Sequence, residues 1–152
     1  MQIQVEERKN KQEWKKILIA CFKTDKELIT KHHIESGKGL YRCVNKTFED
    51  LSNCENLLFY SIKYEGKLCG YFGIENYEDT FFLTGFFIMP KYRNKDFVNI
   101  FWEEINKKTD GEFITGIYKK NDKAKMFLEK TLEFVEEMTD VNNNELLIFK
   151  SK

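Results

Sequence analysis

The chain has 152 residues, of which 41% are hydrophobic and 15% aromatic, and its 25 basic side chains balance 25 acidic ones. This length and apolar content suffice for one domain with a packed core, and they exclude a disordered chain. The balanced charge speaks against a nucleic-acid-binding protein, which normally needs a basic surface.

The cysteines and the apolar runs indicate the cellular compartment. The four cysteines are well separated and form no Cys-x-x-Cys pair. The N-terminus is polar, unlike a signal peptide, and no apolar run approaches the ~20 residues of a membrane span. We therefore expect a reduced, cytoplasmic protein with no membrane segment and no metal site. Cys21 and Cys69, which lie on apolar faces, are expected in the core.

The N-terminal part predicts a strand and a helix. Ile3 and Val5 alternate with polar residues, which is typical of a short strand. Asn10 and Glu13 then form a start signal similar to a capping box. The apolar residues that follow fall on one helical face: Trp14, Ile17, Leu18, Cys21 and Phe22.

A second helix is expected directly afterwards. Thr24 and Glu27 repeat the helix-start signal, and Gly37 is typical of a helix end. The chain between residues 38 and 56 is less regular. Only one short helical turn, Thr47–Leu51, is expected there.

From Leu57 the apolar period changes to two, which predicts a meander of three antiparallel strands. Tight turns are expected at Glu65-Gly66 and at Asn76–Asp79. The strands are predicted at Leu57–Tyr64, Leu68–Glu75 and Phe81–Met89. The last of them ends at the chain's only proline, Pro90.

A helix is predicted from Phe97 to about Lys107, because Phe97, Phe101 and Ile105 recur every four residues. It ends at Asp110-Gly111. The remaining elements are a strand at Phe113–Tyr118, a helix capped by Asn121 and Asp122, and a closing hairpin of Phe134–Val141 and Glu145–Phe149. The pattern as a whole predicts a single α+β domain over residues 1–152.

The strand, loop and helix of residues 81–105 suggest an anion site, because amide N–H groups at a helix start lack partners and suit a phosphate. The order of all the elements resembles the GNAT family of N-acetyltransferases over nearly the whole chain. The segment IMPKYRNKDF is similar to the family's apolar-x-Pro-x-Tyr-Arg strand end and the Arg/Gln-x-x-Gly-x-Gly/Ala loop behind it. The segment GIYKKNDKAKMFLEKTLEF is similar to the family's strand, Asn-x-x-Ala, helix and Gly-Phe element.

The resemblance implies a GNAT-like fold, with a central mixed, mostly antiparallel sheet that is flanked by helices and splayed between its fourth and fifth strands. It implies acetyl-CoA as co-substrate and transfer of the acetyl group to a primary amine, by direct attack in a ternary complex. The amine would belong to a small molecule or a protein lysine. The implied cofactor-binding residues are Phe87, Ile88 and Met89 for the pantetheine arm, Arg93, Asn94, Lys95, Asp96, Phe97 and Val98 for the diphosphate, and Asn121.

The sequence departs from the family pattern at several of these positions. Asp96 and Val98 stand where the family has glycines, which allow a phosphate to approach the backbone closely. The Asp96 carboxylate would repel a diphosphate by roughly 1 kcal/mol, offset in part by Arg93 and Lys95. A glutamate, Glu133, likewise replaces the glycine before Phe134.

The catalytic groups of the family are also replaced. The strand Phe81–Met89 carries no acid, and the position of the family's tyrosine falls near Phe127 or Leu128. Candidate substitutes are Glu75 as base, Tyr118 as the proton donor for the thiolate, and His33 or its neighbour His32. Each also has an ordinary structural interpretation, as a solvated carboxylate, a packed tyrosine or surface histidines.

These departures leave a second interpretation open. The chain could have kept the fold and lost the chemistry, and serve as a binding or structural module. Its small size and its Lys-, Asn- and Ile-rich composition would suit a virion component or host-interaction factor of a phage or mobile element.

Overall fold

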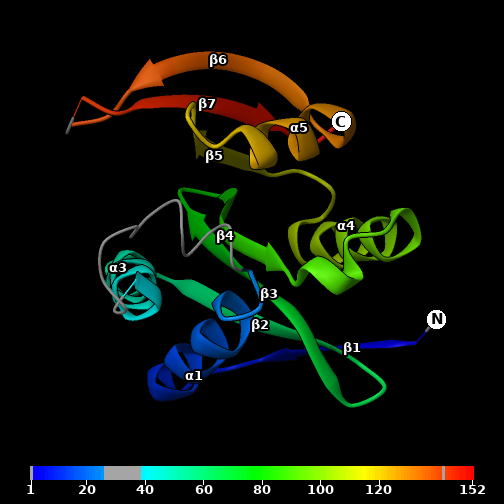
Figure 1. Ribbon diagram of the computed structural model, residues 1–152. Helices are drawn as coiled ribbons and strands as arrows, with labels where there is room; N and C mark the ends of the chain where they lie inside the picture. Colours follow the sequence, from blue (N-terminus) through cyan, green and yellow to red (C-terminus); the bar gives the residue numbers. More distant parts are fainter. Residues whose placement is uncertain (1, 26–38, 142) are drawn as a thin grey trace.

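The computed structural model describes residues 2–25, 39–141 and 143–152. One seven-stranded sheet, in the order β1-β2-β3-β4-β5-β7-β6, runs through it (Figure 1). The strands are β1 (Ile3–Glu7), β2 (Leu57–Tyr64), β3 (Lys67–Tyr77), β4 (Thr80–Ile88), β5 (Ile114–Tyr118), β6 (Glu133–Thr139) and β7 (Glu145–Lys150). The helices are α1 (Lys11–Phe22), α3 (Gly39–Ser52), α4 (Lys95–Thr109) and α5 (Asp122–Thr131), with a 3-10 turn at Pro90–Tyr92.

The sheet is mixed, as the sequence predicted. Strands β1 to β4 pair antiparallel in chain order, and β5, β7 and β6 also pair antiparallel. The junction between the two groups is the parallel pair of β4 and β5. A bulge leaves Thr84 of β4 without a partner on β3, because Gly85 faces Gly73 and Leu83 faces Ile74.

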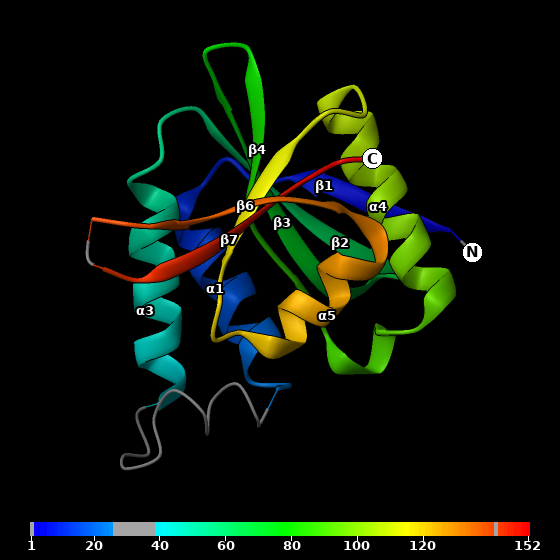
Figure 2. The same ribbon diagram turned by 90° about the horizontal axis from the view of Figure 1, so that it is seen from above.

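Among the described helices, α1 and α3 cover one face of the sheet, and α4 and α5 cover the other (Figure 2). Each helix turns its apolar side chains toward the sheet. On one face, Leu18 of α1 and Val44 of α3 pack with Phe59 of β2, and all three are fully buried. On the other face, Phe101 of α4 lies edge-on to Phe72 of β3, with ring centroids 5.9 Å apart. The predicted core residues Cys21 and Cys69 are likewise fully buried.

Asparagine side chains begin three of the helices. The Oδ1 atoms of Asn10, Asn94 and Asn121 accept from the N–H groups of Gln12, Phe97 and Ala124. Each bond satisfies one of the amides that a helix start leaves unpaired. The predicted caps at Asn10 and Asn121 are therefore confirmed. The predicted break at Asp110-Gly111 is confirmed as well, since both residues have positive φ.

The segment after residue 38 differs from the prediction. A helix of 14 residues, α3, replaces the single turn expected at Thr47–Leu51. Its buried residues Val44 and Leu51 lie two turns apart and pack in the same cluster as α1. Tertiary packing of this kind stabilises a helix more than the propensity of its own residues does. The predicted helix from Thr24 to Gly37, with His32 and His33, falls mainly on residues 26–38, outside the described residues.

The closing hairpin is present, and it ends the sheet with an exposed strand. Every residue of β6 is exposed to solvent. These include Phe134 and Met138, which are 52% and 47% exposed. A register shift against β7 leaves Val135 unpaired between Phe134 and Glu136. In the described part of the chain, no helix combines the length and apolarity needed to span a membrane.

Candidate functional site

The parallel strands β4 and β5 part soon after they meet. They share one residue pair, Phe82 with Ile114, near the start of each strand. Next to it, the buried Thr115 hydroxyl donates to the Leu83 carbonyl at 2.7 Å and joins the strands where they diverge. Beyond this point the sheet is open between the C-terminal halves of β4 and β5, and we call this opening the gap (Figure 1). The predicted splay between the fourth and fifth strands is thus present.

The backbone of β4 alternates between β3 and the gap. The Met89 N–H donates to the Cys69 carbonyl at 2.8 Å, so it faces β3. Because the backbone groups of a strand alternate in direction, Phe87 also faces β3 and Ile88 faces the gap. Of the three amides predicted to hold a pantetheine arm, only that of Ile88 is directed to the gap. Phe87 contributes its ring to the core instead, 5.3 Å from the ring of Phe22.

The predicted diphosphate loop forms the start of α4. Asn94 caps this helix, since its Oδ1 accepts from Phe97 N–H at 2.9 Å and its carbonyl accepts from Val98 N–H. Within the described residues, the amides of Lys95 and Asp96 have no acceptor. The carboxylate of Asp96 lies in the first helical turn, where it stabilises the positive end of the helix dipole. Two free amides and one competing carboxylate therefore stand at the predicted anion site.

Arg93 is bonded within the protein on three sides. Its Nε donates to the Ile88 carbonyl at 2.7 Å, on the gap side of β4. One Nη forms an ion pair with Asp25 at 2.9 Å, and the guanidinium lies 5.2 Å from the centroid of the Phe87 ring. The Asp25 side chain is only 10% exposed. The side chain predicted to bind phosphate thus joins the end of α1 to the edge of β4.

On the other side of the gap, α5 presents aromatic and capping groups. The Asn121 Oδ1 is occupied by the helix cap described above. The resemblance placed the family's tyrosine near Phe127 or Leu128. Phe127 stacks on Phe86 of β4 with centroids 5.8 Å apart, and Leu128 is fully buried. A phenyl ring has no proton to donate. Phe127 therefore closes the α4/α5 side of the gap with apolar surface.

The predicted catalytic side chains lie apart. Tyr118 ends β5 at the open end of the gap and is 45% exposed, with Lys46 of α3 5.8 Å from its ring centroid. Glu75 lies at the closed end, because it pairs with Phe82, which in turn pairs with Ile114. Four residues of strand, roughly 13 Å, separate the two levels. Glu75 and Tyr118 are not placed to act together on one small group, and His33 lies outside the described residues.

Cys54, which follows the C-terminal end of α3, lies close to Glu75. Burial, followed by the charge of Glu75 and a hydrogen bond that the thiol donates to its carboxylate, raises the pKa of the Cys54 thiol to about 11. The thiol also donates to the Asp50 carbonyl at 3.3 Å. A thiol with this pKa is almost entirely protonated at neutral pH and is a poor nucleophile.

Replacing Glu75 with glutamine should therefore speed alkylation of Cys54. The negative charge of Glu75 disfavours the thiolate, so its removal lowers the pKa of Cys54 and increases the thiolate fraction at pH 8. The measurement is the iodoacetamide reaction rate at each cysteine by mass spectrometry, with Cys43 as internal control. An unchanged Cys54 rate would contradict this placement of Glu75.

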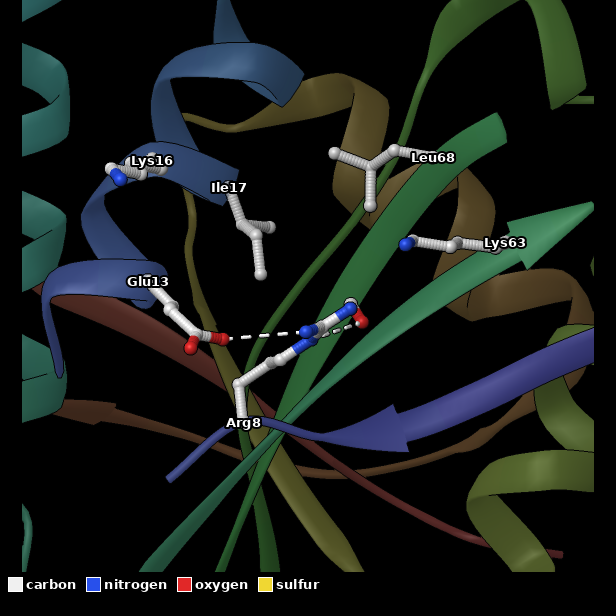
Figure 3. A pocket seen from close by; sticks show the side chains of 7 residues that line it. Arg8, Glu13, Lys16, Ile17, Lys63 and Leu68 are labelled. Atoms are coloured by element: carbon white, nitrogen blue, oxygen red, sulfur yellow. Dashed lines mark hydrogen bonds and ion pairs between the residues drawn. The ribbon is translucent and has the colours of Figure 1, made fainter. Parts of the chain in front are cut away.

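A hollow of about 210 Å³ lies away from the gap, between α1 and strands β2 and β3 (Figure 3). Arg8 crosses it, with Nε donating to the Ser61 hydroxyl and one Nη to Glu13 of α1. The other Nη binds Glu6. All three nitrogens of this guanidinium thus have partners within the protein, so we interpret Arg8 as a structural link between β1, β2 and α1.

Two features of the site have no signal in the sequence. Asp25 is 68 residues from Arg93, and no local pattern predicts their pairing. Thr115 lies in an alternating strand where any residue of moderate size would fit the pattern. Phe127 differs from these two, because the segment of Gly116 to Phe134 places the tyrosine of the resembled family near Phe127 or Leu128.

Comparison with known proteins gives the fold a name. No family model and no curated protein sequence matches this chain. Solved structures do match. An acetyltransferase assigned to the GNAT family from Desulfovibrio desulfuricans has a TM-score of 0.67 at 8% identity, with 99% of both chains covered. The PaiA N-acetyltransferase of Thermoplasma acidophilum, in complex with coenzyme A, has a TM-score of 0.60 at 15% identity, with 97% of this chain and 98% of that one covered.

An aminoglycoside 6'-acetyltransferase of type Ii is similar to a comparable degree. Its TM-score is 0.64 at 12% identity, and the match covers 100% of this chain and 97% of that one. At such low identities the matches establish the architecture, and the residues of the site have to be judged by themselves. The chain therefore has the fold of the GNAT acetyltransferases, in a strongly diverged form.

Proposed function

We propose that this protein is an N-acyltransferase that binds acetyl-CoA and transfers the acetyl group to a primary amine. The observation that carries the proposal is the gap between β4 and β5, with the start of α4 beside its open end. In a GNAT fold this arrangement offers a strand edge for an extended amide-bearing arm and a helix start for phosphates. The coenzyme A complex of the Thermoplasma protein adds support from a chain of the same fold.

The residues of this chain fit such a co-substrate in part. The Ile88 amide would pair with the pantetheine arm, and the amides of Lys95 and Asp96 would face the diphosphate. The side chain of Lys95 would supply a compensating charge. The Asp96 carboxylate acts against this binding, and Arg93 is occupied by Asp25 and Ile88. We therefore expect weak binding.

The reaction we propose is direct attack in a ternary complex. The amine nitrogen forms a bond with the thioester carbonyl carbon and loses one proton to solvent, while the carbon–sulfur bond breaks. The departing thiolate takes a proton from a donor side chain, which solvent then reprotonates. Tyr118, at the open end of β5, is the proton donor that the geometry favours, and Glu75 lies too far along the sheet to assist it directly. An amine that arrives uncharged needs no protein base before it attacks, and water can take the proton that it loses afterwards. Orientation then supplies much of the rate enhancement. The acceptor is a small amine or a protein lysine.

Isothermal titration calorimetry with acetyl-CoA tests this proposal. Binding in the high micromolar to millimolar range is expected, and Asp96→Gly should tighten it about tenfold by removing a repulsion of ~1 kcal/mol and a side chain. Asp96→Asn separates the two effects, because it removes the charge and keeps the side chain. Glu103→Gln, on the same helix but away from its start, is the matched control.

The absence of heat at millimolar acetyl-CoA, in the native chain and in Asp96→Gly, would overturn the proposal. It would favour the second candidate, a GNAT-fold binding or structural module without acyl-CoA chemistry. Two observations support that candidate: the carboxylate of Asp96 at the helix start, and the phenyl ring of Phe127 near the tyrosine position. If binding is detected, acetylation of a panel of polyamines and lysine peptides, followed by mass spectrometry, identifies the acceptor class.

A further inference from the structure

The side chain of Trp102, on α4, carries an unusual unpaired donor. The residue is only 8% exposed, and its Nε1–H has no acceptor within the described part of the chain. The other tryptophan, Trp14, donates its Nε1–H to the Arg8 carbonyl. A buried indole N–H without an acceptor costs about 1–3 kcal/mol, which is why most such groups are paired. The indole N–H of Trp102 is therefore not used by the described part of the protein.

Trp102 lines a cavity of about 290 Å³ between α4, the end of α5 and the chain after β7. Asn99 and Asn106, one turn before and one turn after Trp102, contribute their amides to it, and Phe113, whose ring stacks on Trp102 with centroids 5.9 Å apart, forms a wall. The cavity lies at the closed end of the gap, because Phe113 directly precedes β5 and Lys130 lies in the last turn of α5. It is thus separate from the proposed acetyl-CoA site at the start of α4.

The charged side chains that line this cavity are both basic. Lys130 and Lys152 line it, and neither forms an ion pair with a carboxylate of the described residues. No acidic side chain lines the cavity in the part of the chain that the structure describes. Amide N–H groups, ammonium groups and an indole N–H are all donors, and they suit an oxygen acceptor that bears negative charge.

We propose that this cavity binds a small oxyanion, a carboxylate or a phosphate group. Lys130 and Lys152 neutralise its charge, and Trp102 donates its free indole N–H to one oxygen. Asn99 and Asn106 are both exposed, so their side chains are free to adjust as the ligand enters. The stacked rings of Trp102 and Phe113 provide an apolar wall that favours a ligand with a planar body. This inference does not depend on the acyltransferase proposal.

Nuclear magnetic resonance of the ¹⁵N-labelled full chain tests the site directly. The two tryptophans give two indole N–H signals, and Trp102→Phe or Trp14→Phe assigns them, so one variant suffices if the other fails to fold. We expect the Trp102 signal to move saturably when benzoate or inorganic phosphate is added up to about 20 mM, a range that detects millimolar affinity. The Trp14 signal should stay in place. Tighter binding of benzoate would indicate a carboxylate ligand, and tighter binding of inorganic phosphate would indicate a phosphate ligand.

The lysines supply the second part of the test. Lys130→Ala and Lys152→Ala should each weaken binding about five- to tenfold, since each removes a charge-assisted contact. Lys9→Ala removes an equal charge from a side chain that is 88% exposed and distant from the cavity, and it should leave the affinity unchanged. A Trp102 signal that does not respond to either probe would overturn the proposal. If all three lysine variants weakened binding equally, the proposal would also be overturned, because the affinity would then depend on the net charge of the protein alone.

Discussion

Replacing Gly70 with alanine should destabilise the fold by about 3 kcal/mol or more, which is a large part of the stability of a small domain. A Cβ atom at this position would lie 2.1 Å from the Phe87 carbonyl oxygen and 3.2 Å from the Ile88 Cα. Both atoms belong to the backbone of the neighbouring strand, so no side chain can rotate to relieve the overlap. The two strands would have to separate just where β4 borders the gap.

Gly73→Ala, three residues further along β3, is the matched control. The nearest atom to its added Cβ is the Cδ1 of Leu57, at 3.3 Å, and the next is the Cδ2 of Leu51. Because these atoms are the ends of flexible side chains, we expect Gly73→Ala to lower the free energy of unfolding by at most about 1 kcal/mol. Urea unfolding followed by circular dichroism gives both values. An equal decrease in the free energy of unfolding in both variants would show that β3 and β4 lie further apart at Gly70 than in this structure.

Arg93→Ala should destabilise the protein by about 2–3 kcal/mol with no ligand present. The change removes the hydrogen bond to Ile88, the stacking on Phe87 and the ion pair with Asp25, whose carboxylate is nearly buried. Removing a cationic partner from a nearly buried carboxylate is costly. The one-third exposure of the Arg93 side chain reduces the effect below that of a fully buried pair. A residue that served only to bind phosphate would have almost no effect on the ligand-free protein.

A double-mutant cycle isolates the ion pair. Asp25→Ala, Arg93→Ala and the double variant, compared by urea unfolding, should give a coupling energy of about 1–2 kcal/mol. Arg93→Lys keeps the charge and loses the bond from Nε, so it should recover only part of the stability. Additive losses would mean that Asp25 and Arg93 do not interact in solution, and Arg93 would then be free for the predicted phosphate contact.

Much of the fold could be predicted from the sequence, because helix caps, turns and strand periodicity depend on residues that are neighbours in the chain. Asn10, Asn121 and the Asp110-Gly111 break act through bonds within a few residues, and the period-two pattern from Leu57 needs only neighbouring residues to be recognised. The main error, α3, shows the limit of this approach. Its helix depends on contacts of Val44 and Leu51 with α1, and the residues around Tyr41 and Cys43 have no strong helical preference of their own.

The site was predicted less completely, because its geometry depends on distant residues. The resemblance located the gap and the loop before α4. It could not indicate that Asp25 pairs with Arg93, or that Met89 donates to Cys69 and so turns its amide away from the gap. Nor could it show that Glu75 and Tyr118 lie at opposite ends of the gap. These relations follow from strand register and from packing between the faces of the sheet.

The exposed strand β6 has a consequence for the behaviour of this protein in concentrated solution. A free sheet edge with exposed apolar side chains, here Phe134 and Met138, is a template on which a second chain could add a strand. Glu133, Glu136 and Glu137 occupy the same strand, and the bulge at Val135 interrupts its regular pairing surface. Glu133 and Glu137 already form ion pairs with Lys150 and Lys119. The interruption at Val135, together with the charge of Glu136, therefore opposes stacking of the chains into aggregates.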